Sequence, residues 1–222
     1  MKHSLLKPLF YSGLLGLSII ALSGCGGKSH NGKFNGKFVD DKVVGADWKC
    51  SSKSGVTDAN GVFGPCPKGS LVTISIGKVI LGKVKETKDG IVTPQDIAGV
   101  PRTDTSNPLA AKMASLILSL DPDGNPDNGI QILPEIKNVL NDKVGNGGSI
   151  NNIDVTTVAT DVKTAIENNP TLKATIESKI NASVNMEVKT AAQAAAQLDA
   201  TAQAIENGEI TPPPPPTDNA TD

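Results

Sequence analysis

The chain has 222 residues, with 21 Lys and Arg against 23 Asp and Glu, so its formal net charge is −2 and it has no electrostatic reason to bind nucleic acid. Aromatic residues, on which bases and sugars usually stack, make up only 3% of the chain. Arg102 is the only arginine, which argues against a bidentate clamp for a phosphate or carboxylate ligand.

Residues 1–24 have the pattern of a secretory signal. Lys2 and Lys7 give it a basic start, and an apolar stretch fills residues 9–21. The alternatives are a plain secretion signal with Cys25 near its end by chance, or an uncleaved membrane helix. The apolar stretch is short for a membrane helix, which needs roughly 20 residues.

The four residues Leu22-Ser23-Gly24-Cys25 close this signal and resemble the lipobox of bacterial lipoproteins. The resemblance implies that the chain is cut before Cys25 and that Cys25 carries the lipid, which would anchor the protein in a membrane of the bacterial cell envelope. Gly26 follows, where an aspartate would favour the inner membrane. The resemblance therefore implies the outer membrane, on either its periplasmic or its surface face.

Residues 25–33 are rich in glycine and predict a flexible tether. His30, on this tether, is the only histidine after the predicted cut, so no imidazole would be positioned for Ser-His-Asp, Cys-His or zinc catalysis. The adjacent Asp40 and Asp41 are interpreted as solvated surface, because neighbouring residues of a strand point to opposite faces. The sequence therefore predicts a protein that is not an enzyme.

Residues 34–104 predict a small antiparallel β-sandwich, because short apolar runs alternate with turn-forming residues. The candidate strands lie at 36–40, 43–50, 70–76 and 78–84, with a turn and an apolar restart over 57–63. Cys50 and Cys66 are expected to form a disulfide, since paired cysteines outside the cytoplasm generally oxidise. Free thiols or a metal site are the alternatives, but no histidine or third cysteine lies nearby.

The segments Val43-Val44-Gly45 and 55–63 resemble the transthyretin-like or carboxypeptidase-regulatory-like β-sandwich repeats, and residues 116–130 resemble a segment of uncharacterised bacterial surface lipoproteins. This resemblance implies a β-sandwich that serves as an adhesive, spacer or ligand-binding module. Pro65-Cys66-Pro67 departs from the pattern, because proline cannot donate to a sheet. These residues are expected in an edge strand or a loop held by the disulfide.

Residues 105–208 predict a helical domain, so the fold class is α+β. Helix starts are marked by cap residues and by prolines at the first helical position: Asn107-Pro108, Pro134, Asp154 and Asn169-Pro170. The last helix is expected from about Met186 to Asn207. Residues 209–222 include five consecutive prolines at 212–216 and predict a disordered tail.

Between the first two predicted helices, four oxygen-bearing side chains alternate along the chain: Asp121, Asp123, Asn125 and Asp127. Hard cations such as calcium take several oxygen ligands, so this spacing predicts a calcium site. It departs from an EF-hand loop, where a glutamate would replace Ile132 and a glycine would replace Pro126. The alternative is that these residues only form turns.

The sequence thus favours a lipid-anchored, non-catalytic protein that contacts another envelope or surface protein in an interaction, adhesion or assembly role. The alternative is a lipoprotein that binds calcium or a small ligand through residues 121–127.

Overall fold

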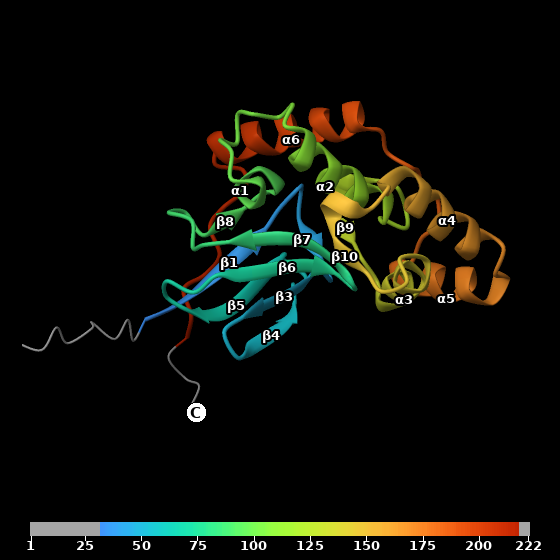
Figure 1. Ribbon diagram of the computed structural model, residues 1–222, viewed down its shortest axis with the longest axis horizontal. Coiled ribbons are helices and arrows are strands. Elements are labelled where there is room, and N and C mark those ends of the chain that lie inside the picture. The colour runs from blue at the N-terminus through green and yellow to red at the C-terminus, as the bar shows by residue number, and fades with distance from the viewer. Residues whose placement is uncertain (1–31, 218–222) are drawn as a thin grey trace, which may run out of the picture.

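The computed structural model describes residues 32–217, so the signal, Cys25 and His30 lie outside the described residues. The described chain has an α+β fold, with most strands in its first part and most helices in its second (Figure 1). Among residues 32–217, no helix combines the length and apolar character needed to span a membrane.

The strands of the described range form a three-stranded sheet in the order β5-β1-β8, a five-stranded sheet in the order β10-β7-β6-β3-β4, and the pair β2-β9. Their bounds are β1 (Lys33–Phe38), β2 (Val43–Val44), β3 (Asp47–Cys50), β4 (Lys53–Val56), β5 (Val62–Pro67), β6 (Val72–Ile76), β7 (Val79–Val84), β8 (Ile91–Val92), β9 (Ile130–Gln131) and β10 (Gly148–Ser149).

The two larger sheets are joined through their buried faces. Burial alternates along β1 and along β6, as expected when one face of each strand lies in a core. Trp48 on β3 contacts Phe63 on β5, with ring centroids 6.3 Å apart. Cys50 on β3 and Cys66 on β5 form the expected disulfide, so a covalent bond links the five-stranded sheet to the edge strand of the three-stranded sheet.

The predicted antiparallel arrangement is wrong for part of this structure. β8 pairs with β1, β9 with β2, and β10 with β7, and all three pairs are parallel. β9 and β10 come from the half of the chain predicted to be a separate helical domain, and one hydrophobic core includes residues of both halves. The boundary predicted at residues 104–105 therefore does not divide two independent units. The sequence did not reveal β9 and β10, because strands of two residues carry no detectable periodicity.

Three helix starts follow from the predicted caps. The Asn107 side chain accepts hydrogen bonds from the backbone N–H of Leu109 and Ala110, and Asp154 and Asn169 cap their helices in the same way. The helices are α1 (Pro94–Ala98), α2 (Pro108–Ser119), α3 (Pro134–Lys143), α4 (Val155–Glu167), α5 (Pro170–Ile180) and α6 (Ala191–Glu206), with short 3-10 turns at η1 (Pro126–Asn128) and η2 (Ile150–Asn152).

The last helix starts later than predicted. Thr190 is its N-cap, and Gln193 completes a capping box with it, which fixes the start at Ala191. The preceding segment is held away from the helix by tertiary contacts: the Asn185 N–H donates to the Pro122 carbonyl at 2.7 Å, and the Lys189 N–H donates to the Ser119 hydroxyl at 2.9 Å.

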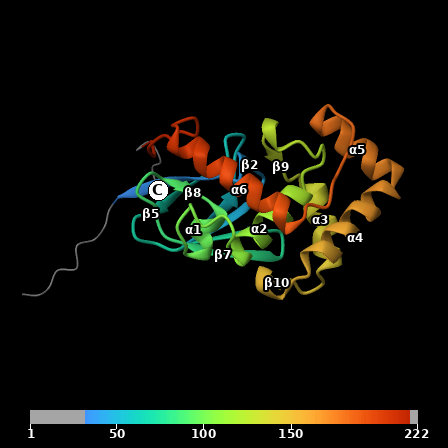
Figure 2. The ribbon, with the colours of Figure 1, turned by 90° about the horizontal axis from the view of Figure 1, so that it is seen from above.

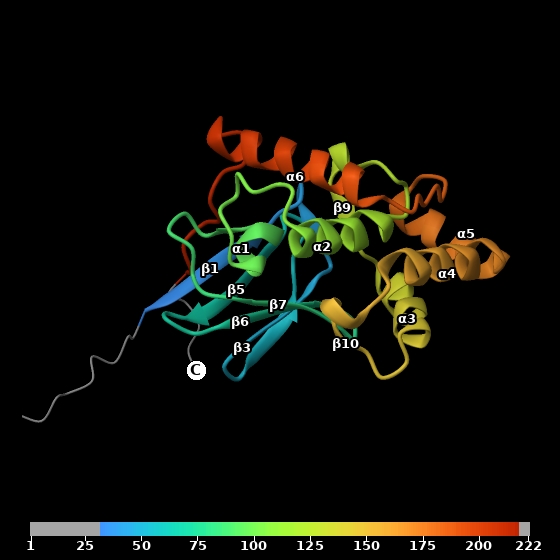
Figure 3. The ribbon, with the colours of Figure 1, turned by 45° about the horizontal axis from the view of Figure 1, so that its top comes forward.

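The helices cover the sheets on one side and extend the molecule at one end. α1 packs against β7 and α2, and α6 crosses over α2 (Figures 2 and 3). α3, α4 and α5 follow one another at the end of the molecule opposite the start of β1 (Figure 1). The inward face of α2, which includes Met113, Leu116 and Ile117, is fully buried in the shared core.

The structure differs from the predicted disordered tail over residues 209–217. The Asn35 amide of β1 donates to the Pro214 carbonyl at 3.0 Å, and the Lys37 ammonium donates to the Thr211 carbonyl at 3.3 Å. Proline has no N–H to donate but keeps its carbonyl, so the outward-facing polar side chains of β1 supply the donors that the segment lacks. Residues 218–222 lie outside the described residues.

Deleting residues 211–222 should lower the free energy of unfolding by about 1 kcal/mol, because it removes these two exposed hydrogen bonds and the packing of the segment against β1. Urea denaturation followed by circular dichroism measures the change. Deleting only residues 218–222 is the matched control and should leave the midpoint unchanged. Equal midpoints for both truncations would show that the contact with β1 does not stabilise the fold.

Candidate functional site

The predicted calcium ligands lie in the segment that joins α2 to β9, residues 121–129, which we call the Asp loop. Asp121 follows Leu120, the C-cap residue of α2, and is only 2% exposed. One of its oxygens, Oδ1, accepts a hydrogen bond from the Gln131 N–H at 3.0 Å. The other, Oδ2, has no hydrogen-bond partner among the described residues. Burial, reinforced by the neighbouring Asp123 carboxyl, raises the pKa of Asp121 to about 7.

Asp123 lies closer to solvent, and its carboxyl is near enough to Asp121 to contribute to the raised pKa of that residue. Its Oδ1 accepts from the Asn125 N–H at 3.0 Å, and its Oδ2 accepts from the Asn128 side-chain amide at 2.8 Å. Partial burial alone would raise the pKa of Asp123, but these donors outweigh it and hold the pKa below its ordinary value. The Asp loop therefore places a buried carboxyl against one that stays ionised.

The other two predicted ligands do not join this pair. The Asn125 side-chain oxygen accepts from the Asp127 N–H at 3.3 Å and caps η1, which is the turn chemistry of the alternative prediction. Within residues 32–217, no three His, Cys, Asp or Glu side chains gather as they would around a metal ion. The structure thus brings together Asp121 and Asp123 and leaves Asp127 outside the group.

The Asp loop is fixed from two sides. Gly124 adopts a φ of +70°, and a Cβ at this position would come within 2.5 Å of the Asn185 carbonyl oxygen, so only glycine fits there. The Asn185 N–H donates to the Pro122 carbonyl at 2.7 Å. On the other side, the Ile130 N–H donates to the Lys42 carbonyl at 2.9 Å. These contacts hold the position of Asp121 and Asp123 without any contribution from a ligand.

A second buried carboxyl was missed by sequence analysis. Asp40 is 0% exposed, and neither of its oxygens has a hydrogen-bond partner among the described residues. It lies in the turn between β1 and β2, which α6 covers: the Asp41 N–H donates to the Thr201 hydroxyl at 3.1 Å. Burial, with a smaller contribution from Asp41, raises the pKa of Asp40 to about 8.

The interpretation of the Asp40 and Asp41 pair as solvated surface is therefore wrong for Asp40. The pair lies in a turn rather than in a strand, so the two residues are not forced to opposite faces of a sheet. The only signal in the sequence is that Asp40 directly follows the apolar residues Phe38 and Val39.

Arg102 has a structural role. Its guanidinium donates to both oxygens of Asp89, at 2.6 and 3.1 Å, and to Asp96 at 3.0 Å. It also donates to the Ile91 carbonyl at 2.7 Å, which ties the chain after α1 to β8. Partial burial alone would lower the pKa of Arg102. The hydrogen bonds and negative charges of Asp89 and Asp96 outweigh this effect and raise it. The side chain is thus engaged within the fold.

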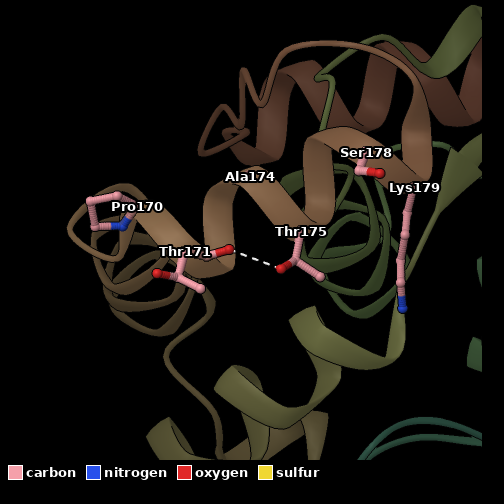
Figure 4. Close-up of a pocket in the computed structure, with 6 residues that line it drawn as sticks. All are labelled: Pro170, Thr171, Ala174, Thr175, Ser178 and Lys179. Atoms are coloured by element: carbon pink, nitrogen blue, oxygen red, sulfur yellow. Dashed lines mark hydrogen bonds between the residues drawn. The ribbon is translucent and has the colours of Figure 1, made fainter.

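A broad hollow on the described surface does not contain these carboxyls. It has a volume of about 690 Å³ and lies along α5, where Figure 4 shows its lining residues: Pro170, Thr171, Ala174, Thr175, Ser178 and Lys179. The Thr175 hydroxyl is bonded to the Thr171 carbonyl at 2.9 Å, and Lys179 is paired with Glu135. A smaller hollow of about 280 Å³ lies beside Pro126 of the Asp loop, between α2 and α6.

The features that suggest chemistry are thus the paired carboxyls of the Asp loop and the isolated carboxyl of Asp40. Comparison with known proteins adds no assignment to either: no family model, no curated protein and no solved structure matches this chain.

Proposed function

We propose that the protein is a lipid-anchored, non-catalytic interaction module of the bacterial cell envelope. The observation that carries the proposal is the run Leu22-Ser23-Gly24-Cys25 after a basic and apolar start, because this pattern is typical of lipoprotein signals. Stable anchoring takes more than one acyl chain, and a modified Cys25 would carry two or three. The disulfide between Cys50 and Cys66 is consistent with folding in an oxidising compartment.

The shape of the described chain fits a tethered module. β1 begins at Lys33, a short tether after Cys25, while α3, α4 and α5 lie at the opposite end of the molecule (Figure 1). An anchor at Cys25 would therefore leave α5 and its surface hollow far from the bilayer. We propose this helical end as the part that meets a partner protein. The resemblance to adhesive and spacer β-sandwiches supports a binding role over catalysis.

Mass spectrometry of the protein extracted from its own membranes tests the anchor. We expect the mature chain to begin at Cys25 and to carry the added mass of fatty-acyl groups. A Cys25→Ala variant should remain without lipid and move to the soluble fraction. A mature chain that begins elsewhere, or that lacks added lipid mass, would contradict the anchor.

Site-resolved cross-linking in intact cells tests the interaction role separately. A photo-cross-linker at Ser178 on α5 should join the protein to one reproducible partner. The same group at Lys68, near the start of β1, is the control and should give little of this product. Equal labelling from both positions would contradict a partner-binding role for the helical end.

A further inference from the structure

We propose that the surface on which residues 211–217 lie is a binding groove for an extended, proline-rich segment of another protein. The chain's own residues 211–217, which we call the cis segment, follow α6 and pass across β1 (Figure 1), and they are a displaceable occupant. This inference does not depend on the lipid anchor or on the helical end. We call the surface the proline groove, and the residues that form it include Asn35, Lys37, Trp48, Val56, Phe63 and Gly90.

The donors of the proline groove match the chemistry of a polyproline chain. Proline has no N–H, so such a chain offers a partner only carbonyl oxygens and ring surfaces. The Asn35 amide donates to the Pro214 carbonyl at 3.0 Å, and the Lys37 ammonium donates to the Thr211 carbonyl at 3.3 Å. These two carbonyls are three positions apart, which is one turn of a polyproline helix. Because both donors bind main-chain oxygens, another proline-rich segment can accept from them equally well.

Gly90 gives a proline ring room to pack on the backbone beside these donors. A Cβ at this position would come within 3.0 Å of the Pro213 Cδ atom, and the φ of +70° also favours glycine. The Gly90 carbonyl accepts from the Lys37 N–H at 2.8 Å, so this space adjoins the strand that carries the donors. The proline groove thus offers both a place for a ring and donors for the neighbouring carbonyls.

The cis segment leaves part of the proline groove unfilled. A hollow of about 420 Å³ lies beside its prolines, and Trp48, Val56 and Phe63 are among the residues that line it. Val56 remains 54% exposed there. A second hollow, of about 260 Å³, lies along residues 213–216. A proline-rich segment with larger apolar side chains at these places would cover surface that the cis segment leaves in contact with water, and this burial favours the partner.

The cis segment is held loosely enough to be replaced. Both of its hydrogen bonds to β1 are exposed, so water competes for the two donors. A polyproline chain also has no internal hydrogen bonds to lose when it leaves a surface. Because α6 tethers the cis segment, its effective concentration at the proline groove is on the order of millimolar. It therefore acts as an intramolecular competitor that a better-fitting segment has to displace.

Fluorescence anisotropy of a labelled synthetic peptide with the sequence of residues 209–217 tests the groove. The protein is the full chain with the five prolines at 212–216 replaced by serine, which removes the rings of the cis segment and keeps the chain length. The peptide should bind this serine variant saturably and about tenfold more tightly than the unchanged full chain, in which the cis segment competes. Adding Asn35→Ala should weaken binding about fivefold through loss of a donor. Adding Asn138→Ala, at an exposed position of α3, is the matched control and should leave binding unchanged.

Four outcomes would overturn the proposal. Absence of saturable binding to the serine variant would show that the groove does not hold a segment supplied in trans. Equal binding to the serine variant and to the unchanged chain, or unchanged binding after Asn35→Ala, would place the peptide elsewhere. Equal binding of a peptide with serine in place of its prolines would remove the preference for proline. If the serine variant does not fold, as judged by circular dichroism, Pro213→Ser alone provides the second test, with a smaller gain in the same direction.

Discussion

Replacing Asp40 with Asn should make the protein more stable at neutral and alkaline pH, and the gain should grow as the pH rises. Asp40 is fully buried without a hydrogen-bond partner among the described residues, so ionising it inside the fold is strongly unfavourable. Asn has nearly the same shape and carries no charge at any pH. The substitution therefore removes the charge and leaves the packing of the β1–β2 turn largely intact.

The direction of the pH dependence follows from the pKa in each state. The pKa of Asp40 is about 8 in the folded chain and 3.8 at its ordinary value. Between these two pKa values the folded state holds a proton that the unfolded state has released. The free energy of unfolding contributed by Asp40 is therefore fully present below about pH 4 and is lost as the pH rises towards 8. Because each pKa unit corresponds to 1.36 kcal/mol, the loss between pH 5 and pH 8 is on the order of 4 kcal/mol.

Urea denaturation of both proteins at several pH values measures this effect. The free energy of unfolding of Asp40→Asn minus that of the unchanged protein should increase by roughly 4 kcal/mol from pH 5 to pH 8. Asp41→Asn is the matched control, since Asp41 is only partly buried and its carboxylate accepts from the Lys42 N–H at 2.7 Å. It should keep most of the pH dependence of the unchanged protein. A difference for Asp40→Asn that stays constant with pH would contradict the buried, protonated carboxyl.

The second large effect is expected from the disulfide. Replacing Cys50 and Cys66 together with Ala should lower the free energy of unfolding by about 3 kcal/mol, because the unfolded chain regains the freedom of a loop of about 15 residues. Both cysteines are fully buried, and they join β3 of the five-stranded sheet to β5 of the three-stranded sheet. The loss should therefore affect how the two sheets are held together.

Differential scanning calorimetry of the double variant should show a midpoint lower by roughly 6–12 °C, given the size of the chain. The unchanged protein treated with a thiol reductant is the control and should match the variant. Reduction should have no further effect on the variant itself. A variant with the midpoint of the oxidised protein would show that the packing of Trp48 against Phe63 is sufficient to hold the sheets.

Local signals in the sequence predicted the helices best. Asn107-Pro108, Asp154 and Asn169-Pro170 are confirmed as helix starts, because a cap residue acts on backbone N–H groups only two or three positions away. The turn at 57–63 is also local: Asp58 accepts from the N–H groups of Asn60 and Val62. Such contacts depend on neighbours in the chain and so can be read from it.

Features set by distant segments were not predictable in this way. β9 and β10 have two residues each and exist only because β2 and β7 pair with them. The position of residues 211–217 depends on hydrogen bonds to side chains of β1. Lys37 and Thr211, one such pair, are 174 positions apart in the chain. Composition indicates that the proline-rich end cannot form a core of its own, but it does not show that this segment contacts β1.

The candidate site was only partly predictable, because some of its features depend on local spacing and others on distant segments. The spacing of Asp121 and Asp123 predicted two carboxyls near one another, and in the structure the Asp123 carboxyl contributes to the raised pKa of Asp121. The spacing did not indicate that Asp127 would lie outside this pair. In the structure, Asn125 caps η1 by accepting from the Asp127 N–H, so the chain turns at this point. Asp40 could not be identified, since its burial depends on α6, which closes over the turn from the far end of the chain.

The parallel pairs β2–β9 and β7–β10 bear on the order in which the protein can fold. A ribosome completes the segment from β1 to β8 well before it reaches β9 and β10, so this segment leaves the exit tunnel with two strand edges still open. The native contacts have a large sequence separation, which slows folding in proteins of this size. The edges of β2 and β7 therefore stay unpaired until the second half of the chain has been made, and during that time they are available for pairing with another chain.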